Sequence, residues 1–412
     1  MDRVILHSDL NNFFASVECL EHPEWSNVPF AVSGSIEKRH GIILAKNEAA
    51  KKYGISTGEA IWTAKQKCPH LITHLPNYDK YISISRKVKS IYSEYSDFVE
   101  SFGIDECWLD ISPIAKDAKD GRLIADEIRR KIRKEIGVTV SVGVSFNKIF
   151  AKLASDIKKP DATTVIDRCD YKDIVWKLPA SELLFVGRST QKALRNMNIK
   201  TIGDIARTDP KILEFVLGKS GYTLWLFANG LDNSPVLSEC ELPRAQSIGN
   251  SVTPPRDLTS DNDISIILYY LCDTVSERMR EGGYMCNTVQ ISIRNTALQT
   301  YERQEKLPFP SRTSRMLYET AYSLFKLNHT AQDAVRSLGV RACDLQDEGT
   351  GQLSFCFDTI DIGDMEKCER LERVSDGIRE RFGSNALKRG IMLTDPYLCS
   401  GNIRGSGTSF EH

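Results

Sequence analysis

Three carboxylates stand where predicted strands end, and carboxylates are the side chains that bind hard divalent cations. Asp105 and Glu106 are adjacent within residues 101–112, which read SFGIDECWLDIS. The apolar–polar alternation on either side of the pair predicts two half-buried strands that meet at a tight turn. Asp9 ends another apolar stretch, in ILHSDLNNFF. If these strands are neighbours in one sheet, the three side chains converge and can bind divalent cations through oxygen.

Phosphoryl transfer is the chemistry that such a trio serves. Two divalent ions about 3.5–4 Å apart can hold the attacking and the leaving oxygen, and they neutralise charge that develops on the phosphoryl oxygens. The alternative is that Asp105 and Glu106 are ordinary surface carboxylates at a hairpin turn. Asp9 favours the functional interpretation, because an aspartate that follows an apolar strand must be paired or solvated.

The surrounding pattern predicts the elements that would position the three acids. Strands are expected at residues 3–9, on both sides of the acidic pair, and at residues 138–145, and amphipathic helices at residues 79–95 and 121–136. The order β-α-β-β-α-β is ferredoxin-like, with an antiparallel sheet covered by two helices on one face. In this fold the first strand lies beside the central hairpin, so the three acids can share one end of the sheet.

The length of 412 residues predicts two to four domains, and the pattern indicates an α+β protein. We expect the following segments: the ferredoxin-like domain at 1–19 and 78–169, an insert at 20–77, an all-helical domain at 170–231, a linker at 232–244, a second α+β domain at 245–347 and a tail at 348–412.

Composition places the chain among ordinary globular proteins. The formal net charge is −1, which argues mildly against nucleic-acid binding unless a basic face is localised. The eleven cysteines form no C-x-x-C pair, which favours reduced thiols in the cytoplasm over a zinc site. No apolar run reaches the ~20 residues needed to cross a bilayer, so we expect no membrane association.

The two acidic stretches resemble the motifs of Y-family translesion DNA polymerases, the DinB or DNA polymerase IV group. Residues 9–18 read DLNNFFASVE and residues 101–110 read SFGIDECWLD. Five further stretches agree with the family in the same order, at residues 47–54, 143–160, 186–206, 230–236 and 247–249. The resemblance covers residues 1–345 and implies palm, fingers, helix-hairpin-helix thumb and little-finger domains at the boundaries given above.

The resemblance implies an active site with two Mg²⁺ ions. Asp9, Asp105 and Glu106 would hold the ions, with the Leu10 carbonyl completing a shell. Asp105 would bridge together with Asp9, and Glu106, the family's catalytic acidic residue, would lie nearest the primer 3′-OH.

The resemblance also implies how a deoxynucleotide binds. The N–H groups of Asn12, Phe13 and Phe14 open a helix and would meet the triphosphate, as would Lys51 and Lys159. Phe14 matches the aromatic steric gate that excludes a ribose 2′-OH.

These nucleotide-binding assignments have simpler alternatives. Phe14 can be a core residue of its helix, and Lys158 and Lys159 can be a solvated surface pair. The sequence also departs from the family, because Lys51 stands where many members have arginine and Glu48 where they have tyrosine. Lysine can meet a phosphate as a point charge but loses the bidentate fork.

DNA contact is expected from the thumb and the little finger. Gly187 opens a helix of the helix-hairpin-helix, whereas Phe185 replaces the first glycine usual in that motif. The little finger is predicted to contact DNA through a face where four arginines gather: Arg256, Arg294, Arg303 and Arg341.

A short segment of the tail resembles the clamp-binding peptide of bacterial polymerases. Its anchors would be Gln352, Leu353, Phe355 and Phe357. The alternative is a small strand that packs on a tail helix.

We therefore expect a template-directed, Mg²⁺-dependent DNA polymerase of low fidelity that copies damaged DNA and has no proofreading nuclease. Its expected partners are primer-template DNA, dNTPs and a sliding clamp, and we expect a monomer. A non-catalytic adaptor is the main rival, but it has no use for Asp9, Asp105 and Glu106. A nucleotidyl cyclase is the second rival, and the helix-hairpin-helix and little-finger motifs argue against it.

Overall fold

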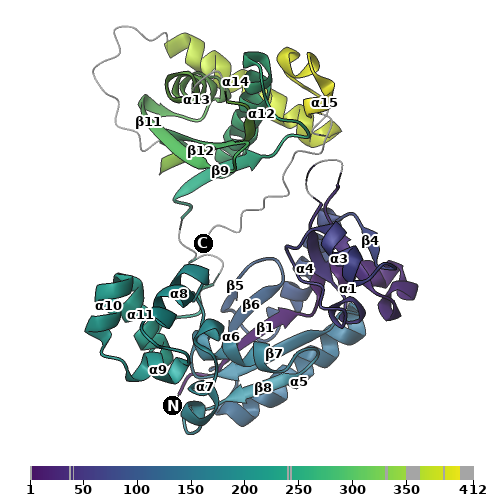
Figure 1. Cartoon of the computed structure of the whole chain (residues 1–412), viewed down its shortest axis with the longest axis vertical. Helices are drawn as coiled ribbons and strands as arrows, with labels where there is room; N and C mark the ends of the chain where they lie inside the picture. Colours follow the sequence, from purple (N-terminus) through teal and green to yellow (C-terminus); the bar gives the residue numbers. More distant parts are fainter. Residues whose placement is uncertain are drawn as a thin grey trace. The chain divides into compact units, whose positions relative to one another are not determined.

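A computed structural model of the chain describes residues 2–36, 39, 41–238, 241, 244–329, 333–348, 362–383 and 386–399. The chain divides into two compact units (Figure 1), one formed by residues 1–34 and 41–242 and the other by residues 35–40 and 243–412. Within the described ranges, no helix combines the length and apolar character that a membrane span requires.

The palm of the first unit is built on a five-stranded sheet in the order β5-β6-β1-β7-β8. The strands are β1 (Ile5–Leu10), β5 (Val99–Ser101), β6 (Glu106–Asp110), β7 (Val140–Ser145) and β8 (Thr163–Ile166). The first four are antiparallel, which is the predicted ferredoxin-like arrangement. The fifth, β8, pairs parallel with β7 and was not predicted. Its four residues follow a Lys-Pro turn and give too short an apolar run to stand out from a loop.

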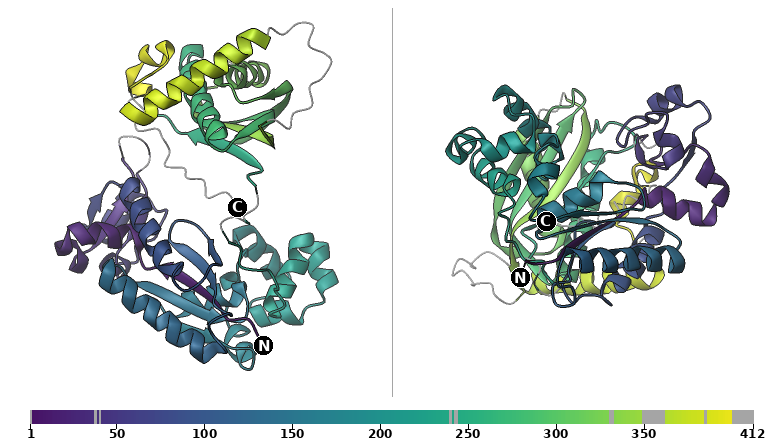
Figure 2. Two further views of the ribbon diagram at one scale, coloured as in Figure 1. Left: turned by 180° about the vertical axis from the view of Figure 1, so that it is seen from behind. Right: turned by 90° about the horizontal axis from the view of Figure 1, so that it is seen from below.

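Helices cover both faces of this sheet. The predicted helices α4 (Tyr78–Tyr92) and α5 (Ala118–Glu135) pack on one face, and α6 (Lys148–Ile157) lies on the other, as Figure 1 and its reverse view in Figure 2 show. Gly143 of β7 permits the close approach of α6, because a Cβ there would lie 1.9 Å from the Ala151 carbonyl oxygen.

Side chains of β1 alternate between these two faces, as the period of a strand requires. Leu6 and Leu10 join the core under α4 and α5. Ile5 and His7 point the other way, where Ile5 packs with Ala151 of α6 and His7 contacts Ser155. Asp9 belongs to this second set, so its carboxylate faces the side of the sheet that carries α6.

The fingers insert is a small subdomain with its own core. Its elements, together with the helix that leads into it, are α1 (Phe13–Glu21), η1 (Pro23–Asn27), β2 (Phe30–Ser33), β3 (Ile43–Lys46), α2 (Glu48–Lys51), α3 (Ile61–Lys67) and β4 (Ile72–His74). Asn47 fixes the start of α2, since its side chain accepts a hydrogen bond from Ala50 N at 2.9 Å and donates to the carbonyls of Trp25 and Val28.

The thumb is all-helical, as predicted. It contains α7 (Tyr171–Val175), η2 (Ala180–Glu182), α8 (Arg188–Asn196), α9 (Ile202–Arg207), α10 (Pro210–Leu217) and α11 (Lys219–Ala228). Thr201 and Asp204 form a capping box at the start of α9, which satisfies backbone N–H groups at both N-cap and N3.

The first half of the predicted linker is fixed to the palm. Val236 is buried against Ile5 and Trp108. Arg3 Nη1 donates to the Ser234 carbonyl at 2.7 Å, and Leu237 N donates to a Glu100 carboxylate oxygen at 2.8 Å. Residues 232–237 therefore pack as part of the first unit.

The little finger contains a four-stranded antiparallel sheet in the order β11-β10-β12-β9 with helices on one face. Its elements are β9 (Ser247–Val252), α12 (Asp261–Glu281), β10 (Tyr284–Asn295), β11 (Thr300–Ser311), α13 (Ser314–Asn328) and β12 (Val335–Asp347). Strand β11 was not predicted, because as an exposed edge strand it carries mostly polar residues.

The tail packs on the helical side of the little finger (Figure 2). It contributes α14 (Ile362–Phe382), η4 (Gly390–Leu393) and α15 (Pro396–Cys399). Arg280 of α12 pairs with Glu372 at 2.5 Å and with Asp376 at 2.6 Å. Leu398 is buried in the core of this unit. The predicted clamp anchors, Gln352, Leu353, Phe355 and Phe357, lie outside the described residues.

Candidate active site

Strand register brings the three predicted acids to one end of the palm sheet. Asp9 on β1 is directly opposite Glu106, the first residue of β6. Asp105 immediately precedes β6, and its carbonyl accepts a hydrogen bond from Leu10 N at 3.0 Å. The end of β1 that carries Asp9 and the start of β6 that carries the acidic pair are thus fixed to each other through their backbones.

Two lysines from the α6 region contact the carboxylates. Lys159 Nζ lies 2.8 Å from Asp9 Oδ2 and 2.7 Å from Asp156 Oδ1. Lys152, on the face of α6 turned to the sheet, pairs with Glu106. Sequence reasoning singled out Lys159 and missed Lys152. Lys152 could have been found from its position on the amphipathic helix that follows β7. The same helix carries Lys148, which contacts Trp108 of β6.

Burial and neighbouring charged groups give the three acids different pKa values. Burial raises the pKa of Asp9 to about 7 against the effect of Lys159, and the charges of Glu106 and Asp105 add to the rise. Burial and the charge of Glu106 also raise the pKa of Asp105. Burial acts to raise the pKa of Glu106 too, but contacts with His7 and Lys152 outweigh it and lower that pKa to about 2. Asp9 therefore takes up a proton more readily than Glu106.

His7 is a second contact of Glu106 that sequence reasoning missed. Its side chain is 0% exposed. Its Nε2 lies 3.2 Å from Glu106 Oε2, and its Nδ1 lies 2.9 Å from Ser155 Oγ. Burial lowers the pKa of His7 to about 4, so the imidazole is neutral near pH 7 and the contact with Glu106 is not an ion pair. Lys152 is accordingly the cation that stabilises the Glu106 carboxylate.

The donor set fits magnesium in type. The three carboxylates and the Leu10 carbonyl are oxygen ligands, which Mg²⁺ prefers. Burial first, and then the neighbouring carboxylate charges, raise the pKa values of Asp9 and Asp105, and a bound cation would oppose this rise. Across the described ranges no three side chains of His, Cys, Asp or Glu are arranged as ligands of one ion. Lys159 and Lys152 contact Asp9 and Glu106 instead, so an ion would have to displace these lysines.

Phe14 lies where α1 meets the aromatic residues of α4. Its ring stacks on Tyr81 with centroids 4.3 Å apart and an interplanar angle of 12°, and it meets Tyr78 edge-on at 5.8 Å. Phe13 is buried in the palm core, whereas Phe14 is half-buried. Phe14 is thus held firmly by its neighbours and still presents part of its surface to solvent.

Asn12 and Lys51 meet at one carboxylate. Asn12 has left-handed backbone angles, φ 50° and ψ 40°, at the start of α1, and its side chain does not cap that helix. Asn12 Nδ2 instead donates to Glu48 Oε1 at 3.0 Å, and Lys51 Nζ lies 3.5 Å from the same oxygen.

The predicted thumb contact has an open helix start. Gly187 is the N-cap of α8 and no side chain caps this end. A Cβ at Gly187 would meet nothing within 4 Å, so the backbone there is accessible. Phe185 adopts φ 68°, a conformation that favours glycine, and its side chain is exposed.

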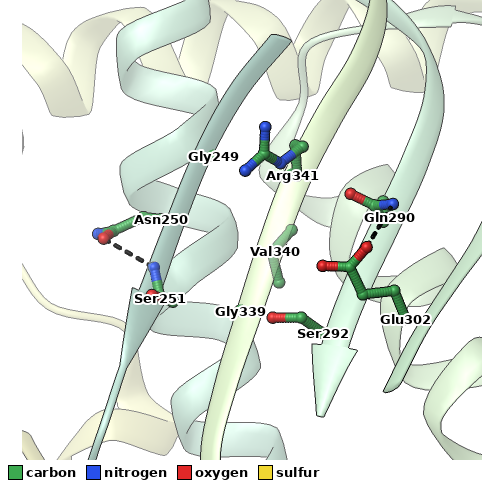
Figure 3. A pocket seen from close by; sticks show the side chains of 9 residues that line it. All are labelled: Gly249, Asn250, Ser251, Gln290, Ser292, Glu302, Gly339, Val340 and Arg341. Carbon is green, nitrogen blue, oxygen red and sulfur yellow. Dashed lines mark hydrogen bonds between the residues drawn. The ribbon is translucent and has the colours of Figure 1, made fainter. Parts of the chain in front are cut away.

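The structure does not bring the four predicted arginines to one face of the little finger. Arg341 lies on the sheet face opposite α12 and α13, beside Gln290 and Glu302 (Figure 3), and Arg294 follows Ser292 on the same face of β10.

The other two arginines are on the helical side. Arg303 is opposite the buried Ile291, and its Nε donates to Asn328 of α13 at 3.0 Å. Arg256 pairs with Asp263 at 2.7 Å and with Asp395 at 2.8 Å. Strand alternation decides the side on which Arg303 falls, and this could not be derived because β11 was not predicted.

Comparison with known proteins agrees with this architecture. The model of the impB/mucB/samB family matches residues 8–156, and that of the family's C-terminal domain matches residues 245–355. The DNA polymerase IV of Acetivibrio thermocellus is 52% identical over 96% of this chain and 98% of its own length. DNA polymerase IV 2 of Bacillus subtilis is 35% identical over 95% of each chain. The solved structure of a Y-family DNA polymerase chimera, Dbh-Dpo4(243-245)-Dbh, superposes with a TM-score of 0.74 at 22% identity, covering 84% of this chain and all of that one.

The chain belongs to the impB/mucB/samB family, the Y-family DNA polymerases. Within that class it falls in the DNA polymerase IV (DinB) group of translesion polymerases. The resemblance, the mixed α+β fold with a little finger, and the expectation of a DNA-directed DNA polymerase are confirmed.

Proposed function

We propose that the chain extends a DNA primer by Mg²⁺-dependent nucleotidyl transfer at Asp9, Asp105 and Glu106, with low fidelity and without proofreading. The observation that carries this proposal is the register of β1 on β6, which sets Asp9 opposite Glu106 with Asp105 beside it. A non-catalytic adaptor would gain nothing from three crowded acids whose burial is unfavourable.

The carboxylates and the Leu10 carbonyl would hold two Mg²⁺ ions. Bound magnesium would activate the primer 3′-OH and neutralise charge on the phosphoryl oxygens. Asp9 and Asp105 would bind the ions jointly, and Glu106, which stays ionised, would lie nearest the primer end. Lys152 keeps the Glu106 carboxylate charged and oriented until the substrates bind.

The incoming deoxynucleotide would be held by the start of α1 and by two lysines. The N–H groups of Asn12, Phe13 and Phe14 have no side-chain cap to satisfy them, which suits a phosphate. Lys159 would leave Asp9 for the triphosphate once a cation replaces it there, and Lys51 would approach from the fingers. Phe14, stacked on Tyr81, would exclude a ribose 2′-OH.

Primer-template DNA would be bound by the thumb and the little finger. Gly187 offers the open start of α8, a suitable site for a backbone phosphate. Arg294 and Arg341 share the face of the little-finger sheet opposite α12 and α13. Arg256 and Arg303 are engaged on the other side, and we assign them no role in DNA binding.

A sliding clamp would bind Gln352, Leu353, Phe355 and Phe357, and the chain would act as a monomer in the cytoplasm. The free thiols at the described cysteines are consistent with a reducing compartment.

Primer extension tests the proposal. With Mg²⁺ and dNTPs the protein should extend a primer on undamaged DNA and continue past an abasic site, and EDTA should stop both reactions. A mismatched primer end should be retained, since no proofreading is expected. Failure to extend undamaged DNA, or extension that survives EDTA, would contradict the proposed mechanism.

A further inference from the structure

A carboxylate stands among the residues that we assign to the triphosphate. Glu48 begins α2, a single helical turn, and Lys51 lies one turn further on. Glu48 Oε1 accepts a hydrogen bond from Asn12 Nδ2 at 3.0 Å and lies 3.5 Å from Lys51 Nζ. One carboxylate oxygen therefore engages the side chains of two residues that are proposed to bind the substrate.

Other charges near Glu48 are mostly positive. Lys46, at the end of β3, has its pKa lowered by burial and by the charge of Lys51, and Glu59 and Glu48 partly offset this. This dependence places Lys46, Lys51 and Glu48 within electrostatic reach of one another. The fingers thus present two lysines, and Glu48 cancels part of their field.

A triphosphate is a polyanion, so Glu48 opposes its binding in two ways. Its negative charge repels the phosphates, and its ion pair holds Lys51 away from them. Both side chains are partly exposed, 43% for Glu48 and 52% for Lys51. Solvent and salt screen such a pair, so the effect on binding should be modest.

We propose that Glu48 is a positioning residue that lowers the affinity of the polymerase for incoming dNTPs by engaging Lys51 and Asn12. The inference rests on the proposed function, in which these residues meet the triphosphate. Its consequence is that nucleotide insertion reaches its maximal rate only at a higher dNTP concentration than it would without the carboxylate.

The substitution Glu48→Gln separates charge from shape, because the amide oxygen can still accept the hydrogen bond from Asn12. The KM for a correct dNTP should fall about two- to fivefold at low salt, with kcat unchanged. The gain should shrink as salt rises. A lowered KM cannot arise from partial unfolding, so this result would not be mistaken for a structural defect.

A double-mutant cycle with Lys51→Met tests whether the effect passes through the lysine. In the Lys51→Met background, Glu48→Gln should lower KM by less than it does in the wild-type background, since only the charge repulsion remains to be relieved. The matched control is Glu94→Gln, which breaks a carboxylate–lysine pair between the turn after α4 and Lys131 of α5. It should not alter KM.

The outcomes separate this inference from the function on which it rests. If the wild-type chain extends primers but Glu48→Gln leaves KM unchanged or raises it, the inference is overturned and the proposed function stands. An equal gain in the Lys51→Met background overturns the role of Lys51. A wild-type chain that adds no nucleotide overturns the proposed function and this inference with it.

Discussion

Asp9 is the site residue on which burial and neighbouring charges act most strongly in opposite directions. It is buried at the end of a central strand, beside two other carboxylates, and its pKa is raised to about 7 even though Lys159 lies 2.8 Å away. Glu106, one strand away, keeps its charge because Lys152 reaches it from α6. Neighbouring acids with separated pKa values are typical of sites where protons and cations exchange.

Residue types and positions were enough to find Asp9, Asp105 and Glu106 in the sequence, because each stands at a predicted strand end. Lys152 and His7 were not found, since their contacts with Glu106 depend on which face of the sheet α6 covers. Lys159 and Phe14 were identified from the family resemblance, and the structure shows which residues contact them.

Phe14 gives the sharpest prediction at the scale of one residue. Replacing it with alanine should remove the ring that stacks on Tyr81 and open space for a 2′-OH. Discrimination between dNTPs and rNTPs should fall by about a hundredfold or more, a loss of roughly 3 kcal/mol. Single-nucleotide incorporation with each sugar measures this ratio. Unchanged discrimination, with dNTP incorporation retained, would return Phe14 to a purely structural role.

At the scale of elements, the hydrophobic period and the apolar content of each segment decided which strands and helices could be predicted. The palm strands alternate clearly, and α4 and α5 have strong apolar stripes, so the β-α-β-β-α-β core was derived correctly. Strands β4 and β8 read ITH and TTVI, with too few apolar residues to stand out from a loop. Strand β11 reads TYERQEKLPFPS and is mostly polar, because an exposed edge buries little.

The tail helix α14 should stabilise the little finger through buried charge. Glu372 is buried, pairs with Arg280 and accepts a hydrogen bond from Ser314 N at 3.0 Å. Glu372→Ala removes one of the two acids that pair with Arg280 and the acceptor of the Ser314 hydrogen bond, and it should lower the free energy of unfolding of this unit by about 3 kcal/mol. Urea denaturation measures the change. The matched variant Glu380→Ala, at an exposed position of the same helix, should change it by less than about 0.5 kcal/mol.

The start of α12 should make the same unit sensitive to acid. Hydrogen bonds from Arg256 lower the pKa of Asp263 from 3.8 to about 2, and Arg256 also lowers the pKa of Asp395. A depressed carboxyl pKa stabilises the fold above the unfolded-state value, and this stabilisation is lost as pH falls from 3.8 towards 2. The wild type should therefore have a higher Tm than Asp263→Asn at neutral pH, and the gap should close in that acid range. A gap that does not change with pH would contradict this origin.

At the scale of the whole molecule, charge is the feature that sequence described least well. The net charge of −1 gives no sign that the arginines of the little finger are divided between the two faces of its sheet. Arg256, Arg280 and Arg312 are committed to acids within the unit, including those of the tail. Such pairing needs three-dimensional contacts between α12, α13 and α14 that no sequence period encodes.

The segment that resembles a clamp-binding peptide predicts that the protein assembles with a sliding clamp. Deleting residues 352–357 should abolish stimulation of primer extension by a bacterial sliding clamp, measured as the ratio of rates with and without clamp. The double variant Leu353→Ala and Phe357→Ala should do the same with less disturbance of the chain. Stimulation that persists in both would favour the alternative, a strand that packs on the tail helix.

The most direct test of the central claim is single-nucleotide primer extension by the double variant Asp105→Ala and Glu106→Ala, compared with wild type at saturating Mg²⁺. Circular dichroism should show that both proteins are folded. We predict that wild type adds the templated dNTP and that the double variant is slower by at least about a thousandfold, because two of the three carboxylates proposed to bind Mg²⁺ are gone. Extension by the double variant at the wild-type rate would show that catalysis does not occur at these carboxylates.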